Sequence, residues 1–276
     1  MRVLVTGAAG FLGAELSRRL ATNSSVDLYA MTHSYGGRVF CDLLDQDAVN
    51  LVFKQVTPDI VVHCAAEVPK READYLSETV IDRNTSMVKV LINAANCPVI
   101  FISSMAVYDD ALGMPCSENQ AGGDLSAYGT SKLQCEALLA EAGVLGVALR
   151  LPGLYGSDRK AGLVHNLLYA LKHQRELSLP DKPVMWAAMD VIDAANVIEQ
   201  FVMLKYSEGF VPVNVGYAEK MSVNRLVNLA ADMYATNISY EVIHKDFEFI
   251  LEKMAEFGVV LKSSFTQSLE ALNDRV

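Results

Sequence analysis

Short apolar runs alternate with longer amphipathic runs over the first 150 residues, and this alternation limits the fold more than any other feature. The apolar runs are continuous, as expected for strands that are covered on both faces. Strands separated by helices form βαβ units, which build a parallel sheet with helices on both sides. The predicted strands are Arg2–Thr6, Val26–Met31, Asp59–His63, Val99–Ser103 and Val144–Arg150, and the predicted helices are Phe11–Leu20, Gln46–Gln55, Tyr75–Asn96 and Ala127–Glu141.

The rhythm loosens after Arg150, where prolines and glycines interrupt shorter elements. We therefore predict an α/β fold, in which a doubly wound parallel sheet is followed by a smaller C-terminal lobe of mixed structure. The predicted dinucleotide-binding domain covers residues 1–155, and residues 187–204 are expected to return to it. The remainder of 156–276 is predicted to be mainly a substrate-binding lobe.

Composition excludes several classes of function. The chain carries 23 Lys and Arg against 33 Asp and Glu, a formal net charge of −10. Such an acidic protein lacks the basic surface of a nucleic-acid binder, and an anionic membrane repels it. No run reaches the ~18 apolar residues that a membrane helix needs. Charged residues interrupt the first apolar run, which argues against a secretion signal. We expect a cytoplasmic protein with neither a nucleic-acid nor a membrane partner.

Cysteine spacing adds a further expectation. Five cysteines are scattered through the chain, with no CxxC motif and no Cys/His ligand spacing. They are expected to be reduced, buried thiols, and no metal site is predicted.

A glycine-rich loop, Thr6–Gly13, follows the first predicted strand and leads directly into a helix. Gly7 allows the tight turn, Gly10 lets the backbone approach a pyrophosphate, and Gly13 lets the helix lie close to the sheet. Phe11 and Leu12 begin the helix, where unpaired amides and the positive dipole end attract phosphate. This context predicts a dinucleotide site and a Rossmann-like fold. The alternative is a tight turn that binds no ligand.

The end of the second predicted strand bears on the choice between NAD and NADP. A carboxylate at this point binds the ribose 2′-hydroxyl of NAD and repels a 2′-phosphate. Here the chain has Thr32, His33 and Ser34, with Arg38 shortly after, and no carboxylate. All four side chains are candidates to contact a 2′-phosphate, so NADP is favoured. The alternative is NAD bound without the acidic residue.

A candidate catalytic pair, Tyr128 and Lys132, is four residues apart and so lies on one helix face. An ammonium group ~4 Å from the phenol is expected to lower the tyrosine pKa from ~10 toward neutrality. Tyr128 is then predicted to exchange a proton with a carbonyl or alcohol oxygen, while Lys132 also reaches the nicotinamide ribose. Ser104, at the end of the fourth predicted strand, is predicted to hydrogen-bond the same oxygen. The alternative is a surface pair on an ordinary helix.

With these motifs in place, the chain resembles the extended short-chain dehydrogenases/reductases, in the NAD-dependent epimerase/dehydratase group that acts on nucleotide sugars. Thr6–Gly13 matches the family's TGxxGxxG, and Tyr128 and Lys132 match its YxxxK. The other matching segments are Asp42-Leu43, His63–Ala66, Asn84, Ser104 with Val107-Tyr108, Glu136, Leu149–Gly156, Val191–Ala195 and Val213–Gly216.

The resemblance implies roles for several of these residues. Asp42 and Leu43 are expected near the adenine, and Cys64, Ala65 and Ala66 beside the cofactor. The candidate substrate contacts are Glu67, Met105 and Gly153. The resemblance also implies a nucleotide-sugar substrate and a homodimer.

Departures from the family pattern leave the reaction open. Gly153 stands where the family has a substrate-binding Asn, and Met105 and Ala106 stand where the sugar 4,6-dehydratases carry Asp-Glu. The chain's length and its Leu149–Gly156 stretch resemble more closely the dTDP-4-dehydrorhamnose reductase-like branch, which also includes a non-catalytic subunit of methionine adenosyltransferase. The loss of the Asn at Gly153, and a chain shorter than that of typical 4-epimerases, predict a smaller and more open substrate lobe. Because an open lobe suits cofactor exchange at every turnover, we favour a 4-keto-sugar reductase. The alternatives are an epimerase that retains its cofactor and a non-catalytic NADP-binding regulatory subunit.

Overall fold

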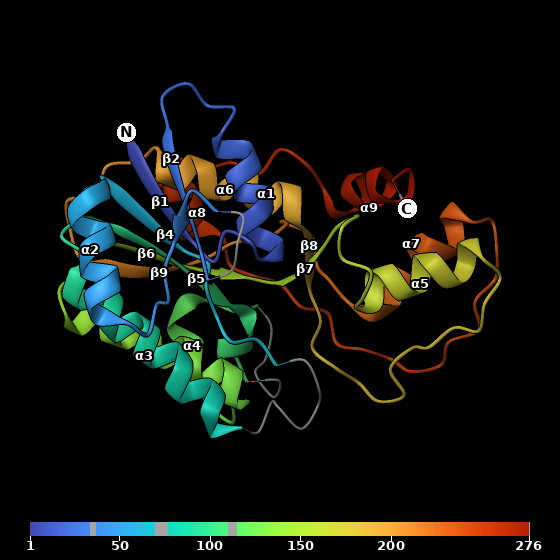
Figure 1. Cartoon of the computed structure of the whole chain (residues 1–276). Helices are drawn as coiled ribbons and strands as arrows, with labels where there is room; N and C mark the ends of the chain where they lie inside the picture. The colour runs from blue at the N-terminus through green and yellow to red at the C-terminus, as the bar shows by residue number, and fades with distance from the viewer. Residues whose placement is uncertain (34–36, 70–76, 110–114, 276) are drawn as a thin grey trace.

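A parallel sheet of seven strands forms the centre of the molecule, in the order β3-β2-β1-β4-β5-β6-β9 (Figure 1). The structure is a computed structural model that describes residues 1–33, 37–69, 77–109 and 115–275. The order reverses between β1 and β4, as in a doubly wound sheet, so the predicted fold class is confirmed. The strands are β1 Arg2–Thr6, β2 Asp27–Thr32, β3 Val39–Phe40, β4 Ile60–His63, β5 Val99–Ser104, β6 Gly146–Leu151 and β9 Phe210–Asn214.

Helices cover both faces of this sheet (Figure 1). On one face α1 (Phe11–Leu20) packs against α6 (Val191–Val202), and on the other lie α2 (Gln46–Val56), α3 (Glu78–Ala94) and α4 (Ala127–Glu141). Successive side chains of a strand point to opposite faces, so β1 contributes to two cores. Val3 and Val5 belong to the core beneath α1 and α6, and Leu4 to the core beneath α2, α3 and α4.

Most of the predicted elements form within one or two residues of their expected ends. Helices α1 and α4 have the predicted bounds. Helix α3 begins at Glu78 and ends at Ala94, whereas the sequence predicted Tyr75–Asn96, and Tyr75 lies outside the described residues. No strand was predicted at 210–214. Pro212 interrupts the apolar pattern there, but β9 lies at the edge of the sheet, where a proline is tolerated.

A smaller lobe lies beside one end of the sheet (Figure 1). Strands β7 (Gly153–Tyr155) and β8 (Ala188–Asp190) pair in parallel as a separate two-stranded sheet. The other elements are the 3-10 turns η2 Met105–Val107 and η3 Glu118–Gln120, and the helices α5 Leu163–Lys172, α7 Val223–Met233, α8 Glu252–Glu256 and α9 Phe265–Asn273. Helices α5, α7 and α9 form the smaller lobe together with β7 and β8, whereas α8 contacts β9 of the main sheet and the turn η2 contacts α4 and β6 (Figure 1).

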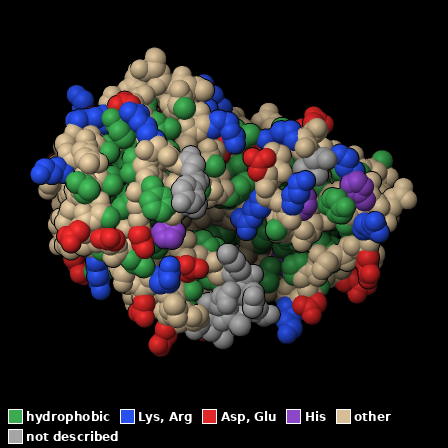
Figure 2. Space-filling model, viewed as in Figure 1, with side chains coloured by type: hydrophobic (Ala, Val, Ile, Leu, Met, Phe, Trp, Pro, Cys, Tyr) green, Lys and Arg blue, Asp and Glu red, His purple; other side chains and the backbone are tan. Residues whose placement is uncertain are grey.

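The surface and the cysteines bear on the expected classes of function. On the face shown in Figure 2, lysine and arginine side chains are scattered among acidic ones. Within the described ranges, no helix is long and apolar enough to cross a membrane. Over the same ranges, no cluster of three His, Cys, Asp or Glu is placed to hold a metal ion. All five cysteines are free thiols, of which Cys64 and Cys97 are only half-buried.

Candidate active site

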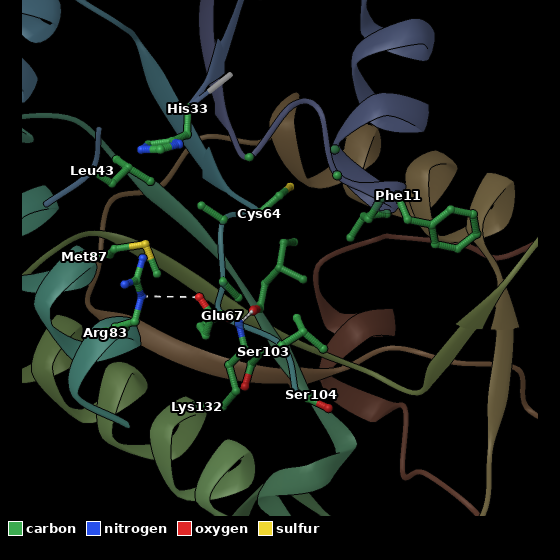
Figure 3. Close-up of a pocket in the computed structure, with 18 of the residues that line it drawn as sticks. Phe11, His33, Leu43, Cys64, Glu67, Arg83, Met87, Ser103, Ser104 and Lys132 are labelled. Atoms are coloured by element: carbon green, nitrogen blue, oxygen red, sulfur yellow. Dashed lines mark hydrogen bonds and ion pairs between the residues drawn. The ribbon is translucent and has the colours of Figure 1, made fainter. Parts of the chain in front are cut away.

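A cavity of about 560 Å³ opens at the carboxyl ends of β1, β4 and β5, beside the point where the strand order reverses (Figure 3). Ligands of doubly wound sheets bind at this place, and the volume lies in the range of small-molecule sites. The predicted site residues that line it are Gly7, Gly10, Phe11, Leu12, Thr32, His33, Asp42, Leu43, Cys64, Ala65, Ala66, Glu67, Ser104, Tyr128, Lys132 and Gly153. Met105 and Arg38 do not line it, and Ser34 lies outside the described residues.

The glycine loop has the backbone geometry that a dinucleotide phosphate requires. Gly7 has a φ of +65°, and a Cβ there would lie 2.6 Å from the Ala65 amide nitrogen. Gly10 caps the start of α1 without any side-chain hydrogen bond to the helix. The first amides of α1 are therefore available to an anion at the cavity wall. The backbone of the glycine loop and the start of α1 therefore fit the phosphates of a dinucleotide.

At the β2 end of the cavity, Arg38 is occupied elsewhere. Its Nη1 donates to Asp27 Oδ1 at 2.7 Å and to the Leu28 carbonyl at 2.8 Å, and its guanidinium lies 4.0 Å above the Tyr29 ring. The hydrogen bond from Arg38 lowers the Asp27 pKa. An acid at the start of β2 therefore holds the arginine that we expected to contact a 2′-phosphate.

His33 and Asp42 face each other at the same end of the cavity. His33 Nε2 lies 3.6 Å from Asp42 Oδ2, and both side chains are exposed. Thr32 is buried. The polar groups at this end thus come from the end of β2 and from the segment after β3.

The two serines at the end of β5 are held by different partners. Ser103 is buried and donates to Glu136 Oε1 of α4 at 2.5 Å. Ser104 is less buried, and its Oγ accepts from the Ala106 amide at 3.1 Å. Ser103 therefore supports the helix, whereas Ser104 remains the predicted contact for a substrate oxygen.

Tyr128 and Lys132 reach the cavity from the first turns of α4, which Ser126 caps by accepting from the Gly129 amide. Lys132 Nζ donates to the Ile102 carbonyl at 2.7 Å and lies 5.6 Å from the centroid of the Tyr128 ring. Burial lowers the Lys132 pKa to about 8 and raises the Tyr128 pKa to about 12. The lysine therefore does not lower the phenol pKa as we expected, because its ammonium group points at the end of β5 and desolvation dominates.

The cavity residues that were not anticipated from the sequence include Arg83 and Met87 on α3, and Arg159 after β7. Arg83 forms an ion pair with Glu67 at 3.3 Å (Figure 3). The neighbouring Asn84 accepts from the Glu67 amide at 2.7 Å and donates to its carbonyl. In a sequence, an arginine such as Arg83 on a predicted helix cannot be distinguished from an ordinary solvent-facing residue. Its position next to the matching Asn84 is the one signal that pointed to it.

A doubly wound sheet with a glycine loop after β1 and a YxxxK helix beside the same cavity defines a short-chain dehydrogenase/reductase fold. Residues 3–216 match the model of the NAD dependent epimerase/dehydratase family, and the chain belongs to this family.

Three curated relatives differ in how much of the chain they match. Methionine adenosyltransferase 2 subunit beta of Danio rerio is 35% identical over 164 residues, which cover 58% of this chain and 50% of the relative. The chain thus spans about half the length of that relative. UDP-glucose 4-epimerase of Yersinia enterocolitica is 26% identical over 94% of this chain and 85% of the relative. A probable dTDP-4,6-dihydroxy-2-methyloxan-3-one 4-ketoreductase of Streptomyces antibioticus is 31% identical over 56% of this chain and 52% of the relative.

Solved structures share the fold over the whole chain. UDP-glucuronic acid 4-epimerase from Bacillus cereus, in complex with UDP-glucuronic acid and NAD, has a TM-score of 0.83 at 21% identity. The match covers 100% of this chain and 98% of that one.

Proposed function

We propose that this protein is an NAD(P)-dependent oxidoreductase that reduces a keto group of a nucleotide-activated sugar. One observation carries the proposal: the glycine loop, Ser104, Tyr128 and Lys132 all border one cavity. Motifs that matched the family pattern only by chance would not be expected to border the same cavity. The family and the nucleotide-sugar enzymes among its relatives support the substrate class.

The cofactor is proposed to lie along the floor of the cavity. The amides of Phe11 and Leu12 would hold its phosphates, and Asp42 and Leu43 its adenine. Lys132 would reach the nicotinamide ribose. When bound, the nicotinamide supplies the hydride. We retain NADP as the preferred form on the missing carboxylate at the end of β2, while the NAD-bound structural neighbours support NAD as the alternative.

Tyr128 is proposed to supply the proton. Its pKa of about 12 keeps the phenol protonated at neutral pH, which is the state needed to donate to a carbonyl oxygen. Ser104 would hydrogen-bond the same oxygen and orient it. An epimerase begins with the opposite step, in which the tyrosine must first accept a proton. The raised pKa therefore favours the reductase.

Two other functions have specific support. The match to a UDP-glucose 4-epimerase over 94% of the chain favours an epimerase that keeps its cofactor. The 35% identity to a methionine adenosyltransferase subunit favours a non-catalytic regulatory subunit. Against the latter, Ser104, Tyr128 and Lys132 are all present at the cavity.

The quantity of cofactor that copurifies with the protein separates these functions. The purified protein is denatured and the released nicotinamide is measured by absorbance. A reductase is expected to release little cofactor and to oxidise added NADPH in proportion to a nucleoside-diphosphate 4-keto sugar. About one equivalent per chain, together with interconversion of UDP-glucose and UDP-galactose, would indicate the epimerase. Binding without turnover of any keto sugar would indicate the regulatory subunit.

A homodimer is proposed to form through α3 and α4. These helices pack side by side on one face of the sheet, and Asn84 of α3 donates to Ser131 of α4 at 3.0 Å. Sedimentation equilibrium measures the oligomeric state, and a strictly monomeric protein at micromolar concentration would contradict the proposal.

A further inference from the structure

Arg159 lies on the lobe side of the cavity, in the turn that follows β7. Its amide donates to the Gly156 carbonyl at 3.1 Å, and its Nη1 donates to the Leu154 carbonyl at 3.1 Å. The guanidinium carbon lies 5.8 Å from the centroid of the Phe11 ring. Two hydrogen bonds to the local backbone thus place this cation next to the first residue of α1.

Two other Lys and Arg side chains line the cavity. Arg83 forms an ion pair with Glu67, and Lys132 is buried and donates to the Ile102 carbonyl. Arg159 also donates to a carbonyl, that of Leu154, but its side chain is exposed. Within the described part of the chain, no carboxylate lies at ion-pair distance from Arg159. Its charge also acts on the cavity itself, because it lowers the Tyr128 pKa against the larger effect of burial. Arg159 is therefore the arginine of the cavity whose charge is available to an anionic ligand.

The turn that carries Arg159 is packed against the phosphate loop. Gly156 approaches the Phe11 ring so closely that a Cβ there would lie 3.2 Å from the ring. Figure 3 shows this ring extending from α1 away from Lys132 and Ser104. The guanidinium of Arg159 thus lies near the side chain of Phe11, the first residue of the helix whose N-terminus has no side-chain cap. In a chain with a net charge of −10, a local cation is needed to offset repulsion of a phosphate.

We propose that Arg159 binds the diphosphate of the dinucleotide and complements the amides at the start of α1. This inference rests on the proposed function, because it requires that the glycine loop hold a dinucleotide. A guanidinium can donate two parallel hydrogen bonds to phosphate oxygens, and its Nη2 and Nε face no carboxylate of the described chain. The smaller lobe then contributes directly to cofactor binding.

Calorimetric titration with ADP-ribose and with adenosine tests this assignment without any turnover. ADP-ribose carries the diphosphate, and adenosine lacks it. Arg159→Gln is expected to weaken ADP-ribose binding about tenfold and to reduce its dependence on salt, while adenosine binding stays unchanged. Arg159→Lys is expected to recover part of the affinity. Lys160→Gln is the matched control, since it removes the same charge from the adjacent exposed residue.

Each other outcome overturns the assignment. Unchanged ADP-ribose affinity in Arg159→Gln would show that the arginine serves another group, while the proposed dinucleotide site would stand. An equal loss in Lys160→Gln would reduce the effect to long-range charge. A wild-type protein that binds neither ADP-ribose nor NADP would overturn the proposed function and this inference with it. Thermal unfolding of each variant establishes that the titrated protein is folded.

Discussion

Glu136 of α4 and Arg150 of β6 form a buried ion pair: Arg150 Nη2 lies 2.6 Å from Glu136 Oε2, and Nε donates to Oε1 at 3.1 Å. Ser103 of β5 donates to the same carboxylate, and Arg150 Nη1 donates to the Tyr108 hydroxyl and the Glu118 carbonyl. These bonds connect two strands with the helix that carries Tyr128 and Lys132. The pair therefore helps to hold α4 against the sheet beside the cavity.

Glu136→Ala is expected to lower the free energy of unfolding by about 3–5 kcal/mol, because it leaves the Arg150 guanidinium buried without its partner. Urea denaturation measures the change. Glu141→Ala, at the exposed end of the same helix, is the control and is expected to cost less than about 0.5 kcal/mol. A loss below about 1 kcal/mol for Glu136→Ala would show that the pair adds little to stability.

Tyr128→Phe is expected to reduce turnover by about 10²–10⁴-fold, because the variant has no hydroxyl for the proton transfer. Affinity for the cofactor should stay nearly unchanged. Initial rates with a keto-sugar nucleotide and a fluorescence titration of NADPH measure the two quantities. The exposed Tyr169 offers a matched control in Tyr169→Phe. Substantial activity in Tyr128→Phe would rule out the proposed acid.

The buried ammonium of Lys132 predicts a pH dependence of stability. Its pKa of about 8 in the folded state lies below the ordinary value of 10.5. Between these values the unfolded state binds more protons, so the free energy of unfolding rises with pH, by roughly 3 kcal/mol in total. Below pH 8 the penalty is fully present.

Lys132→Met removes this titration. Urea denaturation of both proteins at pH 7 and at pH 10 should therefore show the wild type gaining stability relative to the variant at the higher pH. Groups that titrate in both proteins cancel in this comparison. A stability difference that is the same at both pH values would mean that the lysine titrates normally in the folded protein.

Cofactor preference is expected to depend on His33 and not on Arg38. Arg38→Ala should change the ratio of NADP to NAD affinity less than about twofold, because Asp27 and the Leu28 carbonyl already hold the guanidinium. His33→Asp should shift the ratio toward NAD, since a carboxylate there repels a 2′-phosphate. Fluorescence titrations with both cofactors supply the ratios. A large loss of NADP affinity in Arg38→Ala would show that the arginine leaves Asp27 when the cofactor binds.

The sequence by itself determined the fold class and the ends of its best-marked helices. The signals there are local: the glycine loop and Ser126 mark the starts of α1 and α4, and apolar periodicity defines the helical turns after these starts. It also named most residues that border the cavity, because the loop and strand ends of a parallel sheet converge at one edge.

Tertiary structure decided the features that depend on partners distant in sequence. Strand β9 exists because its backbone pairs with β6, about 60 residues earlier in the chain. Arg38 donates a hydrogen bond to Asp27, and Lys132 donates one to the Ile102 carbonyl. Arg159, in the segment after β7, lines the cavity. A long side chain has many rotamers of similar energy, and the hydrogen-bond acceptor or open space that folding places nearby selects among them.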